Sequence, residues 1–191
     1  ISDLKSETQL ADYMKMLGNP DDYTLVLNGH PEDIILNSDT IVVSPGVPMN
    51  IEVLTKAKER GIEVIGEIEL AYRFIKQNKI IGITGTKGKG TTTALIGEIF
   101  RTAGKKFKVG GNIGKPLTGL INGVNDESTY VAELSSFQLE GIKTFKPDIA
   151  AILNLTNDHM DRYKSMQEYV EAKSMVFSNQ TEDDILILNA N

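Results

Sequence analysis

The residues with the most specific chemistry lie in the stretch GITGTKGKGTTT, at positions 82–93. An apolar run precedes it and a segment with helical periodicity follows it, so several backbone N–H groups and a helix N-terminus would converge on one anion. Lys89 stands where a lysine can reach the β- and γ-phosphates of a nucleotide. The stretch predicts a phosphate-binding loop; the alternative is a glycine-rich turn that only connects two elements.

This stretch departs from the generic phosphate-loop pattern, G-x-x-x-x-G-K-[ST]. The pattern would place a glycine at position 83 and a hydroxyl residue at position 90, whereas the chain has Ile83 and Gly90. Hydroxyl side chains follow directly, at Thr91, Thr92 and Thr93. The loop therefore offers hydroxyl groups, but one position later than the pattern requires.

Two further polar residues follow apolar runs, where strands of a sheet would end. Glu133 comes after residues 130–132, and a carboxylate there can bind Mg²⁺, which prefers hard oxygen ligands. The alternative is an acid that simply begins a loop. His159 lies in NLTNDHMDRY, between Asp158 and Asp161. It is interpreted either as a metal ligand or phosphate contact, or as part of a solvated turn.

Lys173 lies in the middle of an apolar helical stripe. Its neighbours three and four residues away are Tyr169, Val170, Val176 and Phe177. A lysine in such a position must extend its ammonium group to water, pair with an acid, or be chemically altered.

These residues depend on a regular alternation of apolar runs and helical segments. Seven runs are short, rich in β-branched residues and bounded by Gly, Asn, Asp or Pro, as buried strands of parallel sheets are. They are residues 23–29, 39–46, 62–68, 79–85, 129–136, 148–156 and 184–191. Helical periodicity predicts helices at about 5–17, 49–60, 67–76, 91–104 and 166–178. The sequence therefore predicts an α/β protein with a mainly parallel sheet, whose ligands bind beyond the carboxyl ends of the strands.

The polar residues KQNK, at 76–79, separate a predicted helix from the strand that leads to the glycine loop. We place a domain boundary there. Residues 1–77 would form a small α/β unit, and residues 78–191 a nucleotide-binding α/β domain. The chain starts at Ile1 and stops directly after its last predicted strand, so both ends are expected to be cut.

Composition excludes several classes of protein. The 191 residues are 40% hydrophobic and 24% charged, as is ordinary for a globular protein. A net charge of −6 argues against general nucleic-acid binding, and the lack of cysteine rules out disulfides. No apolar run has membrane-spanning length and no signal-peptide pattern opens the chain. The expected location is the cytoplasm.

Six stretches together resemble the Mur ligase family, the ATP-dependent amide-forming enzymes of bacterial cell-wall synthesis. They are SPGVP (44–48), GITGTKGKGTTT (82–93), GGNIGKPL (110–117), AELSSFQLE (132–140), NLTNDHMDRY (154–163) and EYVEAK (168–173). Their order and spacing agree with the family over nearly the whole chain. ELSSFQLE and DHMDRY are similar to its D-glutamate-adding branch.

The resemblance implies a fold in two parts. Residues 1–77 would be a small Rossmann-like N-terminal domain that binds the UDP-sugar and lacks its first strand. Residues 78–191 would be part of a P-loop ATPase domain with a mainly parallel sheet. Complete family members continue into a further ATPase segment and a carboxy-terminal domain that binds the incoming amino acid, and neither is expected here.

The resemblance also implies catalytic roles, for Lys89, His159 and Lys173. Glu133 and His159 would bind Mg²⁺, with Thr91 as a further candidate. Lys173 would be carbamylated to hold a second Mg²⁺, which would remove its buried positive charge. ATP would be held by the loop residues Gly85, Thr86, Lys87, Gly88, Lys89, Gly90, Thr91 and Thr92.

Substrate contacts are implied in the same way. Asn112 and Ser135 would contact the UDP-sugar substrate. The uridine end of that substrate would lie near Asp3 and near the turn formed by Ser44, Pro45 and Gly46. The implied reaction transfers the γ-phosphoryl of ATP to UDP-MurNAc-L-alanine, and D-glutamate then attacks the acyl phosphate. The enzyme is expected to be a monomer without membrane or nucleic-acid partners.

Two departures from the family leave alternatives open. The family usually has asparagine at Lys87 and a hydroxyl residue at Gly90, so the hydroxyl contact to Mg²⁺ would pass to Thr91 or be lost. GTKGKG is also similar to the loop of folylpolyglutamate synthases, which add glutamate to folates. A ligase of that kind is the second hypothesis, and a non-catalytic nucleotide-binding fragment is the third.

Overall fold

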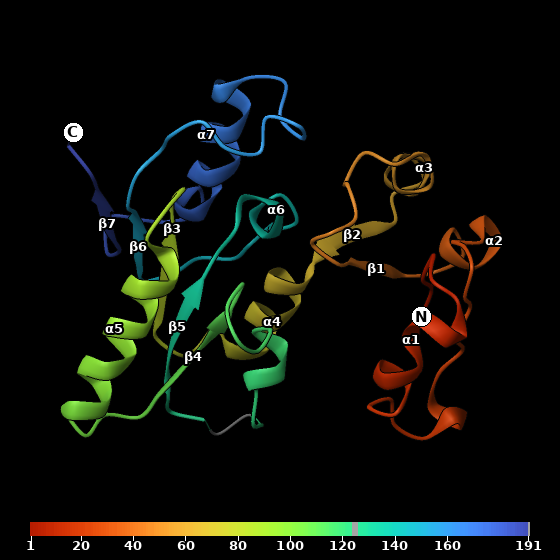
Figure 1. Ribbon diagram of the computed structural model, residues 1–191, viewed down its shortest axis with the longest axis horizontal. Helices are drawn as coiled ribbons and strands as arrows, with labels where there is room; N and C mark the ends of the chain where they lie inside the picture. Colours follow the sequence, from red (N-terminus) through yellow and green to blue (C-terminus); the bar gives the residue numbers. More distant parts are fainter. Residues whose placement is uncertain (124–125, 191) are drawn as a thin grey trace. The chain divides into compact units, whose positions relative to one another are not determined.

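The computed structural model describes residues 1–123 and 126–190. The chain forms two compact units, the first from residues 1–41 and 50–63 and the second from residues 42–49 and from residue 64 onward (Figure 1). Among the described residues, no helix is both long enough and apolar enough to cross a membrane.

The first unit is built mainly from short helices. They are α1 (Glu7–Met14), α2 (Glu32–Ile35), α3 (Glu52–Glu59) and a 3₁₀ turn at Pro20–Asp22. The N-terminus of α1 is capped because the Ser6 backbone N–H donates to the Gln9 side chain, at 2.9 Å. Strands β1 (Thr40–Val43) and β2 (Glu63–Gly66) form a two-stranded sheet, and the division between the units falls within both strands.

The strand predicted at 23–29 is not present. Val26 makes a single isolated parallel bridge with Ser2, and no ladder extends from it. The chain turns away beside the bridge, where the Lys5 N–H donates to the Asp3 carboxylate at 2.8 Å. The prediction was wrong because an apolar run becomes a strand only when a second strand lies beside it along several residues.

The second unit contains a five-stranded sheet in the order β4-β5-β3-β6-β7. All its pairings are parallel, which confirms the predicted α/β class with a parallel sheet. The strands are β3 (Ile80–Thr84), β4 (Phe107–Gly111), β5 (Thr129–Glu133), β6 (Ile149–Ile152) and β7 (Ile185–Leu188).

Strand β4 was not predicted from the sequence. It lies at one edge of the sheet and carries Lys108, which interrupts its apolar pattern. The structure shows why a lysine is tolerated there: its ammonium group is largely buried and pairs with Asp126 at 2.5 Å. A buried lysine is acceptable in a strand when an acid compensates its charge.

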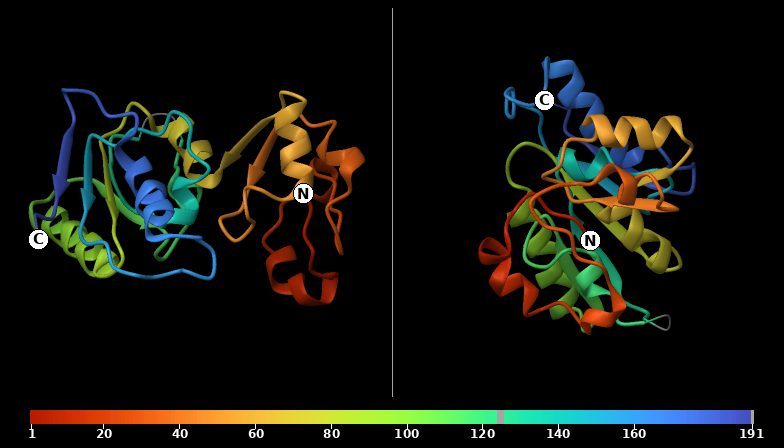
Figure 2. Two further views of the ribbon diagram at one scale, coloured as in Figure 1. Left: turned by 90° about the horizontal axis from the view of Figure 1, so that it is seen from above. Right: turned by 90° about the vertical axis from the view of Figure 1, so that its right-hand side faces the viewer.

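The helices flank this sheet (Figures 1 and 2). They are α4 (Glu67–Ile75), α5 (Lys89–Thr102), α6 (Ser136–Leu139) and α7 (Met166–Ser174), with 3₁₀ turns at Thr118–Leu120 and Met175–Phe177. Helix α5 leads from β3 toward β4, whereas α7 leads from β6 toward β7 in the opposite direction across the sheet. The strand order therefore reverses between β3 and β6, and ligands of open α/β sheets bind beyond such a reversal.

The main core of the second unit lies against α4. Ile68, Ala71 and Ile75 recur at helical spacing on one face of α4 and are almost fully buried, together with Tyr130 of β5 and Phe145. This packing places α4 in the second compact unit. The predicted domain boundary at residue 77 stays a prediction. The compact units divide before α4, because the apolar face of α4 packs in the core of the second unit.

A buried carboxylate on α4 fixes the segment that leads into β6. Glu69 has no exposed surface and accepts hydrogen bonds from the backbone N–H groups of Lys143, Thr144 and Phe145 at 2.8–2.9 Å. The Thr144 hydroxyl donates to the same carboxylate at 2.6 Å. Burial alone would raise the pKa of Glu69, but these hydrogen bonds outweigh it and hold the pKa below its ordinary value.

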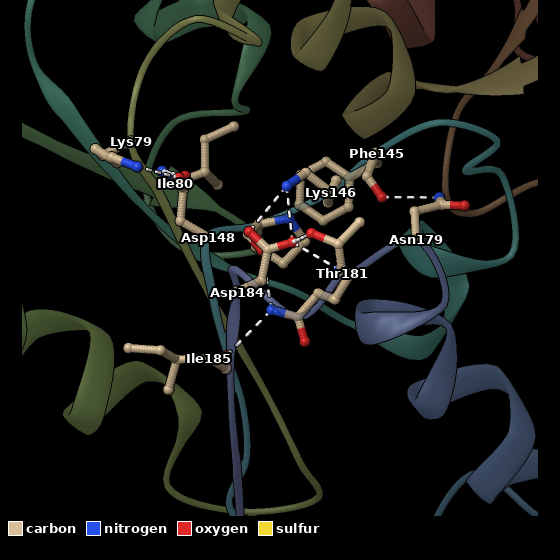
Figure 3. A network of polar contacts seen from close by, with 11 residues as sticks. Lys79, Ile80, Phe145, Lys146, Asp148, Asn179, Thr181, Asp184 and Ile185 are labelled. Atoms are coloured by element: carbon tan, nitrogen blue, oxygen red, sulfur yellow. Dashed lines mark hydrogen bonds and ion pairs between the residues drawn. The ribbon is translucent and has the colours of Figure 1, made fainter.

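A second polar network joins the beginnings of three strands (Figure 3). The Asp148 carboxylate accepts from the Ile80 backbone N–H at 2.8 Å and from Lys79 at 2.6 Å. The Ile185 N–H donates to the Asp148 backbone carbonyl at 2.8 Å. Residue 148 therefore links the starts of β3, β6 and β7, so the opposite ends of these strands reach a common edge.

We predict that Glu69→Gln lowers the free energy of unfolding by about 2–4 kcal/mol, since the amide cannot accept all the hydrogen bonds that the carboxylate receives and leaves buried donors unpaired. Urea unfolding at neutral pH measures the loss. Glu98→Gln is the matched control, because Glu98 is exposed and its ion pair with Arg101 lies on the surface; it should stay close to the wild type.

The same side chain predicts a pH dependence. Its folded pKa lies below the unfolded value of about 4.3, so its contribution is present above that pH and is lost as the pH falls through the folded pKa. The difference in free energy of unfolding between the wild type and Glu69→Gln should become smaller in acid. A gap that widens as the pH falls would contradict this assignment.

Candidate functional site

The glycine-rich loop forms a sharp turn between β3 and α5. Gly85 has φ +142° and Gly88 has φ +83°, conformations that side chains rarely adopt. Gly88 is the N-cap residue, so α5 begins at Lys89. The first backbone N–H groups of a helix have no partner inside it, and they point here toward the loop. The turn is therefore shaped to receive an anion.

Asn154, just after β6, holds the loop from one side. Its backbone carbonyl accepts from the Thr86 N–H at 2.9 Å. Its side chain accepts from the Lys87 N–H at 2.8 Å and donates to the Lys87 carbonyl at 2.9 Å. The exposed side chain of Lys87 takes no part in these bonds. Sequence analysis assigned no role to Asn154.

Thr86 connects the loop to the segment after β6 and to α7. Its hydroxyl exchanges hydrogen bonds with the backbone of Thr156, at 3.0 and 3.2 Å, and lies 3.3 Å from the Tyr169 hydroxyl. Thr156 and Tyr169 were not predicted to act at the site. The available signal was that Thr156 ends a predicted strand run and that Tyr169 lies on the predicted helix of Lys173.

Lys89 is partly buried, and its ammonium group donates to the Thr86 carbonyl at 3.0 Å. This bond directs the Lys89 side chain back toward the loop, so its ammonium group lies beside the turn. Thr91 is exposed and Thr92 is half-buried in the first turn of α5.

Glu133 ends β5 beside the loop. Parallel pairing sets it opposite Ile83 of β3, and its side chain is 6% exposed. Asn112, after β4, donates from its backbone N–H to the Glu133 carbonyl at 2.8 Å and from its side chain to Oε1 at 2.7 Å. Glu133 and Asn112 are thus brought together with the loop. Ser135, two residues on, caps α6 through the Gln138 N–H at 3.3 Å.

His159 lies on an exposed turn with φ +55°. Its Nε2 is 3.8 Å from the Asp158 carboxylate, and its ring lies 5.0 Å from the Phe137 ring, centroid to centroid. The Arg162 guanidinium lies over the Phe137 ring, 4.1 Å from its centre, and pairs with the Glu140 carboxylate at 2.9 Å. Within residues 1–123 and 126–190, no three acidic or histidine side chains form a ready-made metal cluster. The role of His159 as a metal ligand stays a prediction.

Lys173 is 2% exposed and does not extend its ammonium group to water. Nζ donates to the Gly85 carbonyl at 2.8 Å and lies 4.7 Å from the centre of the Tyr169 ring. Burial, together with the nearby charge of Lys89, lowers the pKa of Lys173 to about 8, although Asp158 partly opposes both effects. Of the three outcomes expected from its sequence context, extension to water is excluded. A substantial fraction of this amine is neutral near pH 8.

The remaining predicted site residues are Asp3, Ser44, Pro45 and Gly46. Asp3 belongs to the first unit, where its N–H donates to the Val26 carbonyl at 3.0 Å. Ser44, Pro45 and Gly46 form a turn after β1 that is closed by the Val47 N–H and the Ser44 carbonyl, at 2.9 Å. Their contact with a substrate stays a prediction.

The residues around the loop suit a nucleotide and a divalent cation. The turn at Gly85 and Gly88 leaves backbone N–H groups free for phosphate, and Lys89 supplies a positive charge. Glu133 supplies a carboxylate with one oxygen held by Asn112, and hard oxygen donors are the ligands of Mg²⁺. The donor set therefore fits phosphate chemistry assisted by that ion.

Comparison with known proteins decides the family. A family model described as the Mur ligase middle domain matches residues 83–191, more than half of the chain. The chain belongs to the Mur ligase family. A second model, described as the MurD-like N-terminal domain of Mur ligases, matches residues 3–66. The turn at Gly85–Gly88, together with Glu133, His159 and Lys173, lies within the part matched by the first Mur ligase model.

Two curated relatives of this Mur ligase chain share one enzyme name. The UDP-N-acetylmuramoylalanine–D-glutamate ligase of Geotalea daltonii is 52% identical over 189 residues, which cover 99% of this chain and 41% of the relative. The enzyme of that name from Clostridioides difficile is 46% identical, with coverage of 99% and 42%. The chain thus spans about two fifths of the length of these relatives.

Solved Mur ligase structures share the fold. The UDP-N-acetylmuramate:L-alanyl-gamma-D-glutamyl-meso-diaminopimelate ligase from Neisseria meningitides aligns with a TM-score of 0.60 at 16% identity, over 100% of this chain and 63% of that one. The UDP-N-acetylmuramate-alanine ligase MurC from Thermotoga maritima aligns with a TM-score of 0.53 at 23% identity, over 100% and 43%. At these identities the likeness concerns the fold alone.

We predict that the two turn glycines differ in their tolerance of a side chain. Gly88→Ala should lower the free energy of unfolding by about 1–2 kcal/mol. A Cβ there contacts only the end of the Leu153 side chain, so backbone strain is the main source of the loss. Gly85→Ala should lower the free energy of unfolding by more than Gly88→Ala does, since its Cβ would also lie 3.2 Å from the Asn154 backbone. Urea unfolding of both variants measures the order.

Gly104→Ala serves as the control for that order. Gly104 also has a positive φ, +63°, but a Cβ there meets nothing within 4 Å, and it lies at the opposite end of α5. It should resemble Gly88→Ala. If alanine at positions 85 and 104 lowered the free energy of unfolding equally, the Asn154 backbone would not restrict the side chain at position 85.

Proposed function

We propose that the full-length protein that carries this chain is an ATP-dependent ligase that adds D-glutamate to UDP-MurNAc-L-alanine in peptidoglycan synthesis. The observation that carries the proposal is the 52% identity, over 99% of the chain, to an enzyme named UDP-N-acetylmuramoylalanine–D-glutamate ligase. The geometry of the loop after β3 supports it independently, because its donors suit phosphate. The proposed cellular location is the cytoplasm, and the proposed state is a monomer.

In this proposal the loop residues 85–92 hold the phosphates of ATP. The backbone N–H groups at the start of α5 and the helix dipole favour the negative charge. Lys89 needs only to exchange its bond with the Thr86 carbonyl for one with a phosphate oxygen. Asn154 keeps Lys87 and Thr86 in position, so the loop is organised before the nucleotide arrives.

The proposed metal ligands are Glu133, His159, Thr91 and a carbamylated Lys173, for two Mg²⁺ ions. Bound Mg²⁺ would neutralise charge on the transferring phosphoryl group. Glu133 lies at the loop, whereas His159 lies on an exposed turn. Asn112 and Ser135, with Asp3 and the turn Ser44–Gly46, are proposed to hold the UDP-sugar.

The reaction would proceed through an acyl phosphate. The substrate carboxylate forms a C–O–P link as ADP leaves. The amine of D-glutamate then attacks the carbonyl carbon, the C–O bond to phosphate breaks, and the amine loses a proton as the amide forms. Lys89 balances phosphate charge during both steps, and the rigid loop supplies positioning.

Phosphate release by the full-length protein tests this function. We expect release from ATP that requires both UDP-MurNAc-L-alanine and D-glutamate. Replacing the UDP-sugar with a folate should abolish it, because GTKGKG is the only feature that favours the folylpolyglutamate-synthase alternative. Release with folate and not with UDP-sugar would overturn the proposal, and nucleotide binding without turnover would favour a non-catalytic module.

A second test concerns Lys173. A neutral amine attacks CO₂, its nitrogen forms a bond to carbon as one C=O π bond breaks, and a proton is released. The lowered pKa of Lys173, about 8, makes the neutral form available. After incubation in bicarbonate and chemical trapping of the carbamate, mass analysis of the peptide that contains Lys173 should show the added mass of one CO₂ and the trapping group.

The matched control for that analysis is Lys164, which is exposed on the loop before α7. It should carry no such mass. Lys173→Ala should lower ligase activity, and a short carboxylic acid added to the medium should restore part of it. An unmodified Lys173 together with a fully active Lys173→Ala variant would contradict the modification.

A further inference from the structure

The turn that carries His159 has a strained backbone. His159 has φ +55°, in the left-handed region that residues other than glycine rarely adopt. One bond inside the turn restrains it, because the Asp158 side chain accepts from the His159 N–H at 3.0 Å. A strained conformation on an exposed turn persists where the surrounding structure determines it, and here further support comes from α6.

Arg162 and Tyr163 close the turn onto the His159 carbonyl. Their backbone N–H groups donate to that carbonyl at 3.0 and 3.1 Å. Their side chains reach one carboxylate at the end of α6: Arg162 donates to Glu140 Oε2 at 2.9 Å, and the Tyr163 hydroxyl donates to Oε1 at 2.5 Å. Glu140 thus binds the side chains of the two residues whose backbones hold His159.

The bonds to Glu140 are better protected from water than an ordinary surface ion pair. The side chains of Glu140 and Arg162 are 21% and 20% exposed, and Tyr163 is buried. Exposed pairs contribute little to stability, whereas charge-assisted bonds away from water are stronger. Glu140 is the C-cap residue of α6, and a capping box between Ser135 and Gln138 fixes the start of that helix. The carboxylate is therefore carried by an ordered element.

Aromatic rings from α6 and α7 lie beside the His159 imidazole. Between centroids, the Phe137 ring is 5.0 Å away and the Tyr169 ring 6.2 Å away. The Arg162 guanidinium covers the Phe137 ring at 4.1 Å. The Tyr163 ring lies 6.0 and 5.4 Å from the rings of Phe137 and Tyr169. The two residues bound by the carboxylate therefore also contact the rings that flank His159.

These ring contacts leave the nitrogens of the imidazole available. In the part of the chain that the structure describes, neither nitrogen of His159 has a hydrogen-bond partner, and Nε2 lies 3.8 Å from the Asp158 carboxylate. Tyr169 connects this ring to the phosphate loop, because its hydroxyl lies 3.3 Å from that of Thr86. An imidazole held in this way is suited to bind a metal ion or a phosphate oxygen.

We propose that Glu140 is a positioning residue for His159 at the nucleotide–metal site. It fixes the turn through Arg162 and Tyr163, and it fixes the ring beside the imidazole through the contact of Arg162 with Phe137. The inference rests on the proposed function, because the ligand of His159 belongs to that site. Glu140 acts through the turn and touches neither nucleotide nor metal.

Removing the carboxylate should loosen the turn. In Glu140→Ala, Arg162 loses its charge partner and the Tyr163 hydroxyl loses its acceptor. We expect the Mg²⁺ concentration for half-maximal phosphate release by the full-length protein to rise about tenfold, as when a residue that orients a metal ligand is lost. Tyr163→Phe removes one of the two bonds and should cause a smaller rise. In the Glu140→Ala background it should add nothing, because the acceptor is already absent.

NMR of the imidazole reports its position without metal or substrate. In the full-length protein with ¹³C-labelled histidine, the His159 signal is identified by its loss in His159→Gln. Nearby aromatic rings should displace this signal from the range of exposed histidines, and Glu140→Ala should return it toward that range. His30 is the internal control, since it lies in the first unit beside Ser2, and its signal should not move.

Glu69→Gln separates positioning from stability. It removes hydrogen bonds between α4 and residues 143–145 and should destabilise the same unit. Measured at a temperature where thermal unfolding shows every variant to be folded, it should keep the wild-type His159 signal and Mg²⁺ requirement. Tyr163→Phe, which loses a single hydroxyl, decides the question if Glu140→Ala does not fold.

A displaced His159 signal together with a raised Mg²⁺ requirement, in Glu140→Ala and to a lesser extent in Tyr163→Phe, supports the inference. An unmoved signal in both variants would overturn it and leave the turn to its own bond with Asp158. A displaced signal with an unchanged Mg²⁺ requirement would also overturn it. In both cases the wild type still releases phosphate, and the proposed function stands. If the wild type releases none, the proposed function fails and the inference falls with it.

Discussion

Strand β3 lies between β5 and β6, and its parallel pairing with both is the constraint on which the site depends. Parallel strands end at the same edge, so the loop after β3 meets Glu133 at the end of β5 on one side and Asn154 beyond β6 on the other. The polar network around Asp148 fixes the opposite ends of β3, β6 and β7. A shift of one residue in either pairing would separate the loop from its supports.

The loop is held by its neighbours more than by its own contacts. Asn154 binds both polar groups of the Lys87 backbone, Thr86 bonds to Thr156, and Lys173 donates to the Gly85 carbonyl. Positive-φ turns are costly, and they persist where surrounding structure determines them. Of these contacts, the one made by Lys173 carries the largest desolvation cost, because its amine is buried without an ion pair. A modification that removes its charge would stabilise the arrangement and supply a carboxylate at the same place.

Sequence patterns predicted the central strand of the second unit with its loop and helix. They did not predict the edge strand β4 or the structure of residues 23–29. Strand β3, the loop and α5 combine a buried apolar run with glycine turns and helical periodicity, so they were predicted close to their observed bounds. Strand β4 was missed because Lys108 is neutralised by Asp126, a tertiary contact. The run at 23–29 lacks a pairing strand. The role of Asn154 follows from strand order and register, which no local pattern contains.

The most direct measurement is a crystal structure of the full-length protein with a non-hydrolysable ATP analogue and Mn²⁺ in place of Mg²⁺, with the metal located by its anomalous signal. The account predicts phosphate oxygens on the N–H groups at the start of α5 and Lys89, and a metal peak bonded to Glu133 at about 2.1 Å, as for Mg²⁺. Phosphates bound elsewhere, or a metal that makes no bond to Glu133, would contradict it.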